Sequence, residues 1–564
     1  MSFQDVYEKE LIHIRNTAKE YAKSFPNIAP FLENHSQDQD VERLIEAFAF
    51  LTAKVQKRLD DGVPELSQNI LQTIWPKFLQ PYPSITVLKF GLNDKPKEEK
   101  LTIPKNKIIS GKYKETDLSF RTFADVDIYP INLTKVSSDI YNNKEIIELH
   151  FDIDYKMSLF DFEEIKLPIY ILGNQSTSLQ IAYLLKKKVM NLELLDSNNN
   201  LIGGYDASFS DVDLLEKAGV ESTQPDIFRL ITHYFRYPEL FNYINLELVK
   251  KGISRSRINI DKFKLRITVA LDGIEYIPMT MKNFALYTTP IINVEKASIS
   301  PIHYNNKTKN HKIRLDDNKN KAINKITKVS SLSKNSAKKN EIFLWNDFES
   351  SFNDKPLYKQ FISNNAVNGK PEFNLTFESS VLDNSYISIE GESFCLNTHE
   401  ILGEGDISST TKKLAYTYKN ITHVTAPIIP DYSDRNLWQL INFFSVRLGK
   451  LTTVETLRQL IILFNDIQLH RKTQQKSLTQ KVCNAINKIN LEIEQEYYKG
   501  RVIRGNVIEI IINEQSFLNE GDIYLFGSIL NQIYSSLADV NTYNRVRMIG
   551  MEKGSVMEWQ ACLS

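Results

Sequence analysis

The spacing of apolar residues changes at Ile85, and this change constrains the fold more than any other feature of the sequence. Between Asp40 and Ile85, apolar side chains recur every three or four residues, which predicts α-helices. After Ile85 they occur in short alternating runs separated by Asn, Asp, Gly and Pro, which predicts antiparallel strands. The 564 residues suggest roughly three or four domains, so we expect a multi-domain α+β protein.

Three helices are predicted in the N-terminal helical region, which we assign to residues 1–84. They cover residues 3–25, 41–59 and 64–75, and the second carries apolar side chains around most of its circumference. We expect a small helical bundle, or the beginning of one. From the residues alone, a plain helical subdomain and a helix pair that joins helices of another subunit explain this region about equally well.

An antiparallel β-rich middle is predicted in two portions, 85–304 and 341–430, which flank an insert at 305–340. The insert is rich in Lys, Asn and Ser and has almost no large apolar side chain, so we expect an exposed loop or a disordered segment. The alternative is an arm that binds nucleic acid or lipid headgroups. The insert lacks aromatic residues for base stacking and lacks an amphipathic face, which disfavours that alternative.

The C-terminal part, residues 431–564, begins with two apolar-faced helices around Leu437 and Leu457. A basic, Gln-rich connection at 469–481 follows. The remaining apolar pattern reads as strand, strand, helix, strand, which is a small α+β unit. The predicted C-terminal part is therefore a helical segment plus a compact α+β unit.

Charge and cysteine content restrict the classes of partner. Lys plus Arg and Asp plus Glu each number 69, so no overall field attracts nucleic acid or an anionic membrane. The three cysteines, Cys395, Cys483 and Cys562, are far apart and form no CxxC motif, which fits free thiols in a reducing compartment. The N-terminus lacks the pattern of a signal peptide, and no apolar run is long enough for a membrane span. We expect a cytoplasmic protein.

Catalytic and metal-binding motifs are missing from the sequence. We find no P-loop, no GxSxG elbow and no histidine pair with metal-ligand spacing, and we predict no catalytic residue, cofactor or metal site. Asp125/Asp127 and Asp152/Asp154 each place two carboxylates on one strand face, an arrangement that solvated strands commonly have without a metal. The alternative function is a β-rich hydrolase that acts on polysaccharide through paired carboxylates.

Several long segments resemble a known family. ERLIEAFAFL, VQKRLDD, PEL and WPKFLQPYPS follow one another with fixed spacing near the N-terminus. FRTFADVDIYPINL, HYFRYPELFNYINL, FALYTTPIINV and RGNVIEIIINEQSF follow in order towards the C-terminus. Together they resemble the signatures of the type VI secretion baseplate subunit TssF, also called the VasA/ImpG family. The resemblance weakens only in the 305–340 insert and the β segments around it.

This resemblance implies a structural, non-enzymatic baseplate protein of a bacterial contractile injection machine. It implies that two copies join one TssG to form a wedge, and that wedges surround a central VgrG spike. It further implies that TssK docks the ring to the membrane complex, so that contact with the membrane is indirect, and that the wedge touches TssE and the base of the contractile sheath. The assembled machine would lie at the cytoplasmic face of the inner membrane.

The residues expected at such interfaces are large apolar and aromatic side chains, because obligate interfaces are rich in them. The candidates are Phe3, Tyr7, Leu11, Ile14, Phe48, Phe50, Trp75, Phe235, Tyr237, Phe241, Trp438 and Phe526.

Overall fold

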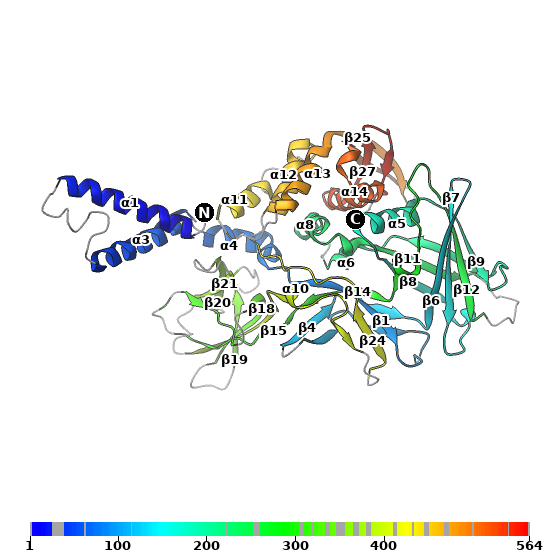
Figure 1. Cartoon of the computed structure of the whole chain (residues 1–564), viewed down its shortest axis with the longest axis horizontal. Helices are drawn as coiled ribbons and strands as arrows, with labels where there is room; N and C mark the ends of the chain where they lie inside the picture. The colour runs from blue at the N-terminus through cyan, green and yellow to red at the C-terminus, as the bar shows by residue number, and fades with distance from the viewer. Residues whose placement is uncertain are drawn as a thin grey trace.

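A computed structural model shows an elongated chain in which a pair of helices projects from a body of sheets and helices (Figure 1). The structure describes residues 3–24, 39–60, 64–96, 98–113, 116–219, 224–251, 260–304, 308, 310–316, 320–332, 339–345, 356–364, 371–378, 385–409, 414–430, 432, 434–444, 451–466, 473–498, 501–539 and 541–561. Helices at both ends and antiparallel sheets between them confirm the predicted α+β class.

The projecting pair consists of α1 (Phe3–Ser24) and α3 (Gln39–Asp60), coloured blue in Figure 1. The rings of Tyr7 and Phe50 lie 6.5 Å apart, and Arg15 Nη2 donates to Glu42 Oε2 at 3.0 Å, so the two helices run antiparallel. The third helix, α4 (Pro64–Ile74), packs on α11 (Asp434–Asn442) in the body. The expectation of a small bundle, or the beginning of one, therefore holds for α1 and α3 as a pair, whereas α4 joins the helices of the body.

The first sheets of the body are antiparallel and draw on distant parts of the chain. One has the order β23-β24-β1-β14-β4-β3. Two strands from beyond residue 400 therefore form one edge of this sheet, and β24 pairs with β1, which starts at Ile85. Its strands are β1 (Ile85–Leu92), β3 (Ile108–Tyr113), β4 (Thr116–Thr122), β14 (Thr288–Asn293), β23 (Ser408–Ser409) and β24 (Tyr416–Asn420). Beside it, β2 (Leu101–Ile103) pairs with β5 (Val126–Ile128).

Two further four-stranded sheets share one apolar core with this region. The order β6-β7-β12-β9 joins β6 (Ile131–Tyr141), β7 (Lys144–Ile153), β12 (Lys262–Ala270) and β9 (Val189–Asp196). The order β10-β11-β8-β13 joins β10 (Tyr205–Ser210), β11 (Tyr243–Lys250), β8 (Glu164–Ile171) and β13 (Phe284–Leu286). Strict alternation of buried and less buried residues along β7 matches the period-two pattern of the sequence.

Short helices connect these strands and cover the sheets. They are α5 (Gln175–Lys187), α6 (Leu214–Ala218), α7 (Gln224–Ile227), α8 (Arg229–Arg236), α10 (Thr398–Ile401) and the 3-10 turns η1 (Pro76–Leu79), η2 (Leu159–Asp161), η3 (Pro238–Phe241) and η4 (Met281–Asn283). Asn174 begins α5, since its side-chain oxygen accepts a hydrogen bond from the Thr177 amide at 2.8 Å.

An eight-stranded sheet follows, with the order β15-β22-β18-β19-β20-β21-β17 and β16 paired to β22. Its strands are β15 (Glu295–Lys296), β16 (Ile302–His303), β17 (His311–Lys312), β18 (Lys321–Leu332), β19 (Lys339–Leu344), β20 (Leu357–Asn364), β21 (Pro371–Glu378) and β22 (Tyr386–Cys395). The predicted boundary at 304/305 falls inside this sheet.

The prediction of an exposed insert at 305–340 is wrong for the residues that form β18. Ile323 and Val329 are buried in the apolar core, and β18 pairs with β22 along its length. Two register shifts in β18 break the regular alternation of buried and exposed residues. The sequence of this strand therefore lacks the period-two apolar pattern, and its polar composition suggested a loop. The parts of the predicted insert at 305–307, 309, 317–319 and 333–338 lie outside the described residues.

The C-terminal part contains the predicted strand, strand, helix, strand unit. It is made of β25 (Ile486–Tyr498), β26 (Arg501–Ile512), α14 (Glu520–Ser536), β27 (Thr542–Gly550) and β28 (Val556–Glu558), with the short turn η8 (Glu514–Ser516). α14 connects β26 to β27, which are parallel. α12 (Val454–Asp466) and α13 (Thr473–Ala485) precede it, so a helix occupies most of the stretch predicted as a connection.

Candidate functional site

The outer face of α3 is the most apolar surface on the projecting helix pair. Leu44, Phe48 and Leu51 are 57%, 55% and 57% exposed, and their spacing of four and three residues places them on one side of the helix. Ala49 and Ala53 lie on the opposite side and are fully buried, because α1 covers them. We call Leu44, Phe48 and Leu51 the α3 face.

Small residues on the covered side explain why both faces of α3 are apolar. Alanines let the α1 backbone approach closely, whereas the large side chains remain on the side that no described part of the chain covers. Burying a large apolar side chain contributes about 1.5–3 kcal/mol of free energy. A partner that buried these three residues would therefore be bound more tightly. Exposed apolar residues gathered in this way are typical of interaction surfaces.

The predicted interface residues divide into several groups in the structure. Tyr7, Leu11, Ile14 and Phe235 are half-buried, Phe48, Phe50 and Trp438 are exposed, and Trp75, Tyr237, Phe241 and Phe526 are buried within this chain. The side chain of Phe3 lies outside the described residues. The four buried residues build the body and do not reach its surface. The prediction also omitted Leu44 and Leu51, although their helical spacing with Phe48 was visible.

Trp75 shows what the buried group does. Its ring centroid lies 4.7 Å from that of Phe78 and 5.5 Å from those of Phe444 and Phe464. Its indole Nε1 donates to Asp226 Oδ1 at 2.6 Å. Trp75 therefore ties the end of α4 to the helical part of the chain beyond residue 430.

A second aromatic cluster surrounds His233 in α8. The ring centroid of His233 lies 4.6 Å from that of Tyr82 and 5.9 Å from that of Tyr237. Burial, and then the nearby Arg229 guanidinium, lower the pKa of His233 to about 3, so the imidazole is neutral at physiological pH. The HYFRYPELF segment is therefore a packed core with a neutral histidine.

A cleft of about 600 Å³ between β1, η3 and the segment at 421–425 is the place to test the hydrolase alternative. Its lining includes two carboxylates, Glu239 and Glu404, among many apolar side chains. Burial raises the pKa of Glu239. A glycosidase needs two carboxyl groups that flank the scissile bond, and Glu239 and Glu404 are the carboxylates that this cleft offers.

The carboxylate pairs on the strands serve local contacts. Asp127 accepts from Lys100 Nζ and Thr102 Oγ1, both at 2.6 Å, and Asp125 accepts from the Lys105 amide. In the part of the chain that the structure describes, no group of three or more His, Cys, Asp or Glu side chains could hold a metal ion. Within the same residues, every helix falls short of the length and apolarity needed to cross a bilayer.

Comparisons with known proteins agree on one family. A family model described as type VI secretion system, TssF, matches residues 1–564. The type VI secretion system component TssF1 of Pseudomonas aeruginosa is 25% identical over a 350-residue alignment, which covers 55% of this chain and 54% of that protein. The matched region thus spans about half the length of that curated relative.

Two solved structures share the fold. A chain of a TssK-TssF-TssG baseplate subcomplex of the type VI secretion system superposes with a TM-score of 0.74 at 20% identity, over 92% of this chain and 98% of that chain. A chain of a type VI secretion baseplate complex gives a TM-score of 0.69 at 16% identity, over 99% of both chains.

Proposed function

Because the chain belongs to the TssF family of type VI secretion proteins, we propose that it is a structural subunit of the baseplate that acts by joining other subunits. The observation that carries this proposal is the α3 face, in which three large apolar side chains point into water from a helix pair that stands apart from the body (Figure 1). A neighbouring chain could cover them while α1 keeps its place on the opposite side of α3.

The first partner of this face is TssG together with a second copy of the chain. A related fold occurs in a TssK-TssF-TssG subcomplex, which supports TssG and TssK as partners. Apolar helix faces pack best in bundles, where each helix covers its neighbour's stripe. The projecting pair, α1 and α3, would supply two helices to such a bundle. Two copies of the chain would join one TssG.

The body then makes the remaining contacts of the wedge. They are with TssK, which docks the ring at the cytoplasmic face of the inner membrane, with TssE and the sheath base, and with the VgrG spike. The mechanism is mechanical, since a ring held by large apolar interfaces transmits a rearrangement from the spike to the sheath. The absence of enzymatic activity belongs to this proposal, and the local use of the strand carboxylates supports it.

Co-expression with TssG from the same secretion cluster tests the proposal. The chain expressed alone should aggregate, because the exposed apolar side chains of the α3 face associate with one another. TssG should cover this face and bring the chain into the soluble fraction as a complex. A chain that is equally soluble and monomeric with and without TssG would contradict the proposal. Turnover of a polysaccharide that is lost in a Glu239→Gln variant would favour the hydrolase instead.

A further inference from the structure

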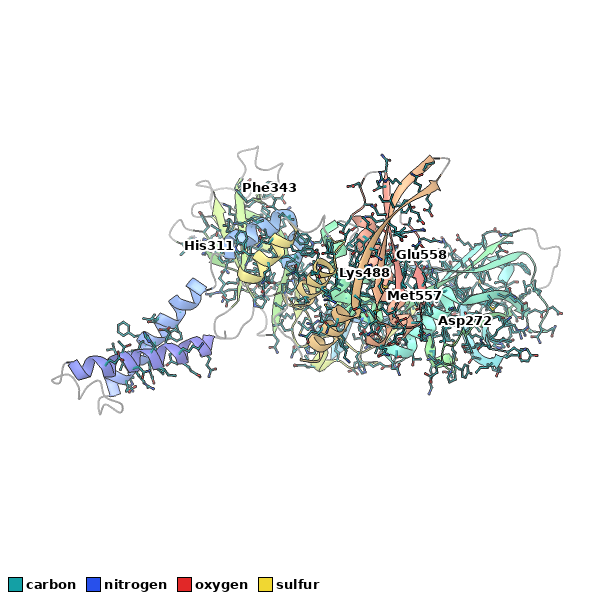
Figure 2. All side chains as sticks on the ribbon, turned by 90° about the horizontal axis from the view of Figure 1, so that it is seen from above. Asp272, His311, Phe343, Lys488, Met557 and Glu558 are labelled. Carbon is teal, nitrogen blue, oxygen red and sulfur yellow. The ribbon has the colours of Figure 1, made fainter. Side chains whose placement is uncertain are left out.

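The C-terminal sheet has an open edge at β25. β25 pairs with β26 from Ile486 to Tyr498, and the sheet order β25-β26-β27-β28 gives it no other neighbouring strand among the described residues. Figure 2 shows the hairpin of β25 and β26 extending beyond the body, with Lys488 near its base. A long open edge presents backbone N–H and C=O groups on which another chain can add a strand.

One face of this hairpin carries apolar side chains that the helices do not cover. Ile508 and Ile510 of β26 are buried beneath the C-terminal helices. On the same face of the edge strand, Leu491 pairs with Ile508 and Ile493 pairs with Asn506, and these two apolar side chains are 51% and 59% exposed. Val502, 53% exposed, lies farther out, beyond the pair of Gln495 and Arg504. The uncovered apolar side chains of β25 therefore lie at the open edge, where an added strand would cover them.

The opposite face is acidic. Glu492, Glu494 and Glu496 alternate along β25 and reach two arginines on β27, Arg545 and Arg547. Glu558 of β28 contacts both arginines as well, at 3.4 and 2.9 Å. In these contacts four carboxylates meet two guanidinium groups, so carboxylates are in excess along β25.

The alternation disfavours a second copy of β25 as the added strand wherever the stretch from Asn490 to Glu496 lies opposite its own copy. Residues that pair directly across two strands lie on the same face of a sheet. A register that keeps the two apolar faces together sets the Glu492, Glu494 and Glu496 row beside its copy, where like charges repel. A register shifted by one residue sets those carboxylates on the same face as the other copy's Leu491 and Ile493. Both arrangements are unfavourable.

We infer that the edge of β25 binds an extended segment of a different protein, in which apolar residues alternate with Lys or Arg. The apolar residues of that segment would continue the face of Leu491, Ile493 and Val502, and its basic residues would neutralise the row of carboxylates. The open stretch from Asn490 to Glu496 corresponds to about 23 Å of strand. This surface is separate from the α3 face and does not depend on it.

A labelled peptide of about ten alternating Val and Lys residues serves as the probe. Fluorescence anisotropy with the full-length chain, as its TssG complex if that is the soluble form, measures the affinity. We expect this peptide to bind at least about tenfold more tightly than one of alternating Val and Glu. Hydrogen exchange should slow at the β25 amides when the Val–Lys peptide binds.

Two changes separate strand addition from charge attraction. N-methylation of every second peptide residue, in the set whose N–H groups face β25, should weaken binding about tenfold, because the backbone bonds are lost. Ile493→Asp should also weaken it about tenfold, whereas Leu201→Asp, at another exposed apolar residue, should leave it unchanged. Equal binding of the N-methylated peptide, equal binding of the Val–Glu peptide, or protection elsewhere in the chain would overturn the inference.

Discussion

Trp75 shows how one residue can hold distant parts of the chain together. Its ring contacts Phe78 from the next turn and Phe444 and Phe464 from the C-terminal helices. The sequence indicated that this tryptophan ends a helix and is apolar enough for an interface. It could not indicate that the covering surface comes from more than 350 residues away in the same chain.

The Trp75→Phe variant should therefore lower the free energy of unfolding by about 2–4 kcal/mol. The smaller ring leaves a gap, and the buried Asp226 carboxylate loses the indole donor. Urea unfolding followed by fluorescence measures the change. Trp438→Phe is the matched control, because Trp438 is 36% exposed, and its midpoint should stay near that of the unchanged chain. Equal loss in both variants would show that Trp75 has no special role.

Glu145 predicts a dependence of stability on pH. It lies on β7 and is fully buried, and the nearby Ser138 hydroxyl only partly offsets the effect of burial on its pKa. Burial raises its pKa to about 7, from 4.5 for an ordinary glutamate. The folded chain therefore holds a proton that the unfolded chain has released, and stability falls as pH rises from about 4.5 to about 7.

The Glu145→Gln variant should remove this part of the pH dependence. Above pH 7 it should be more stable than the unchanged chain by about 2–3 kcal/mol, since a neutral amide replaces a buried charge. Below about pH 4.5 the two should unfold alike, because Glu145 is then protonated in both states. Thermal unfolding across this range measures the difference. Glu400→Gln, at a surface carboxylate, is the control and should follow the unchanged chain.

At the scale of elements, the helical period of α3 was predictable, and so was the breadth of its apolar surface. Which side would be covered was not, because Ala49 and Ala53 carry less apolar area than Leu44 and Phe48. In the structure α1 packs against the side of α3 that carries these two alanines. β18 shows the opposite difficulty, since its polar composition concealed a buried strand whose bulges break the alternation.

A double variant, Leu44→Glu and Phe48→Glu, should leave the secondary structure and unfolding midpoint of the chain nearly unchanged, because both side chains already lie in water. Ala53→Leu should lower the midpoint, since its added volume meets α1. Circular dichroism during heating compares the two. Strong destabilisation by the double variant would mean that the α3 face supports this chain's own fold.

At the scale of the whole molecule, contacts between distant segments set the architecture. Gln68 of α4 is fully buried and binds the backbone of β20, donating to the Ile362 carbonyl at 2.6 Å and accepting from the Ile362 amide at 2.7 Å. The eight-stranded sheet is thereby fixed to the helix that leads to the projecting pair. A glutamine on a helix gives no sequence signal of a contact with a distant strand. The class of fold could therefore be predicted from the sequence, whereas the contacts that hold the helices and sheets together could not.

The mass of the complex co-purified with TssG tests the central claim most directly. The account predicts that native mass spectrometry finds two copies of the chain with one TssG, and that the Leu44→Glu and Phe48→Glu double variant loses this complex while a Leu201→Asp variant keeps it. A double variant that still forms the complex with full yield, or an unchanged chain that remains a stable monomer beside TssG, would contradict the account.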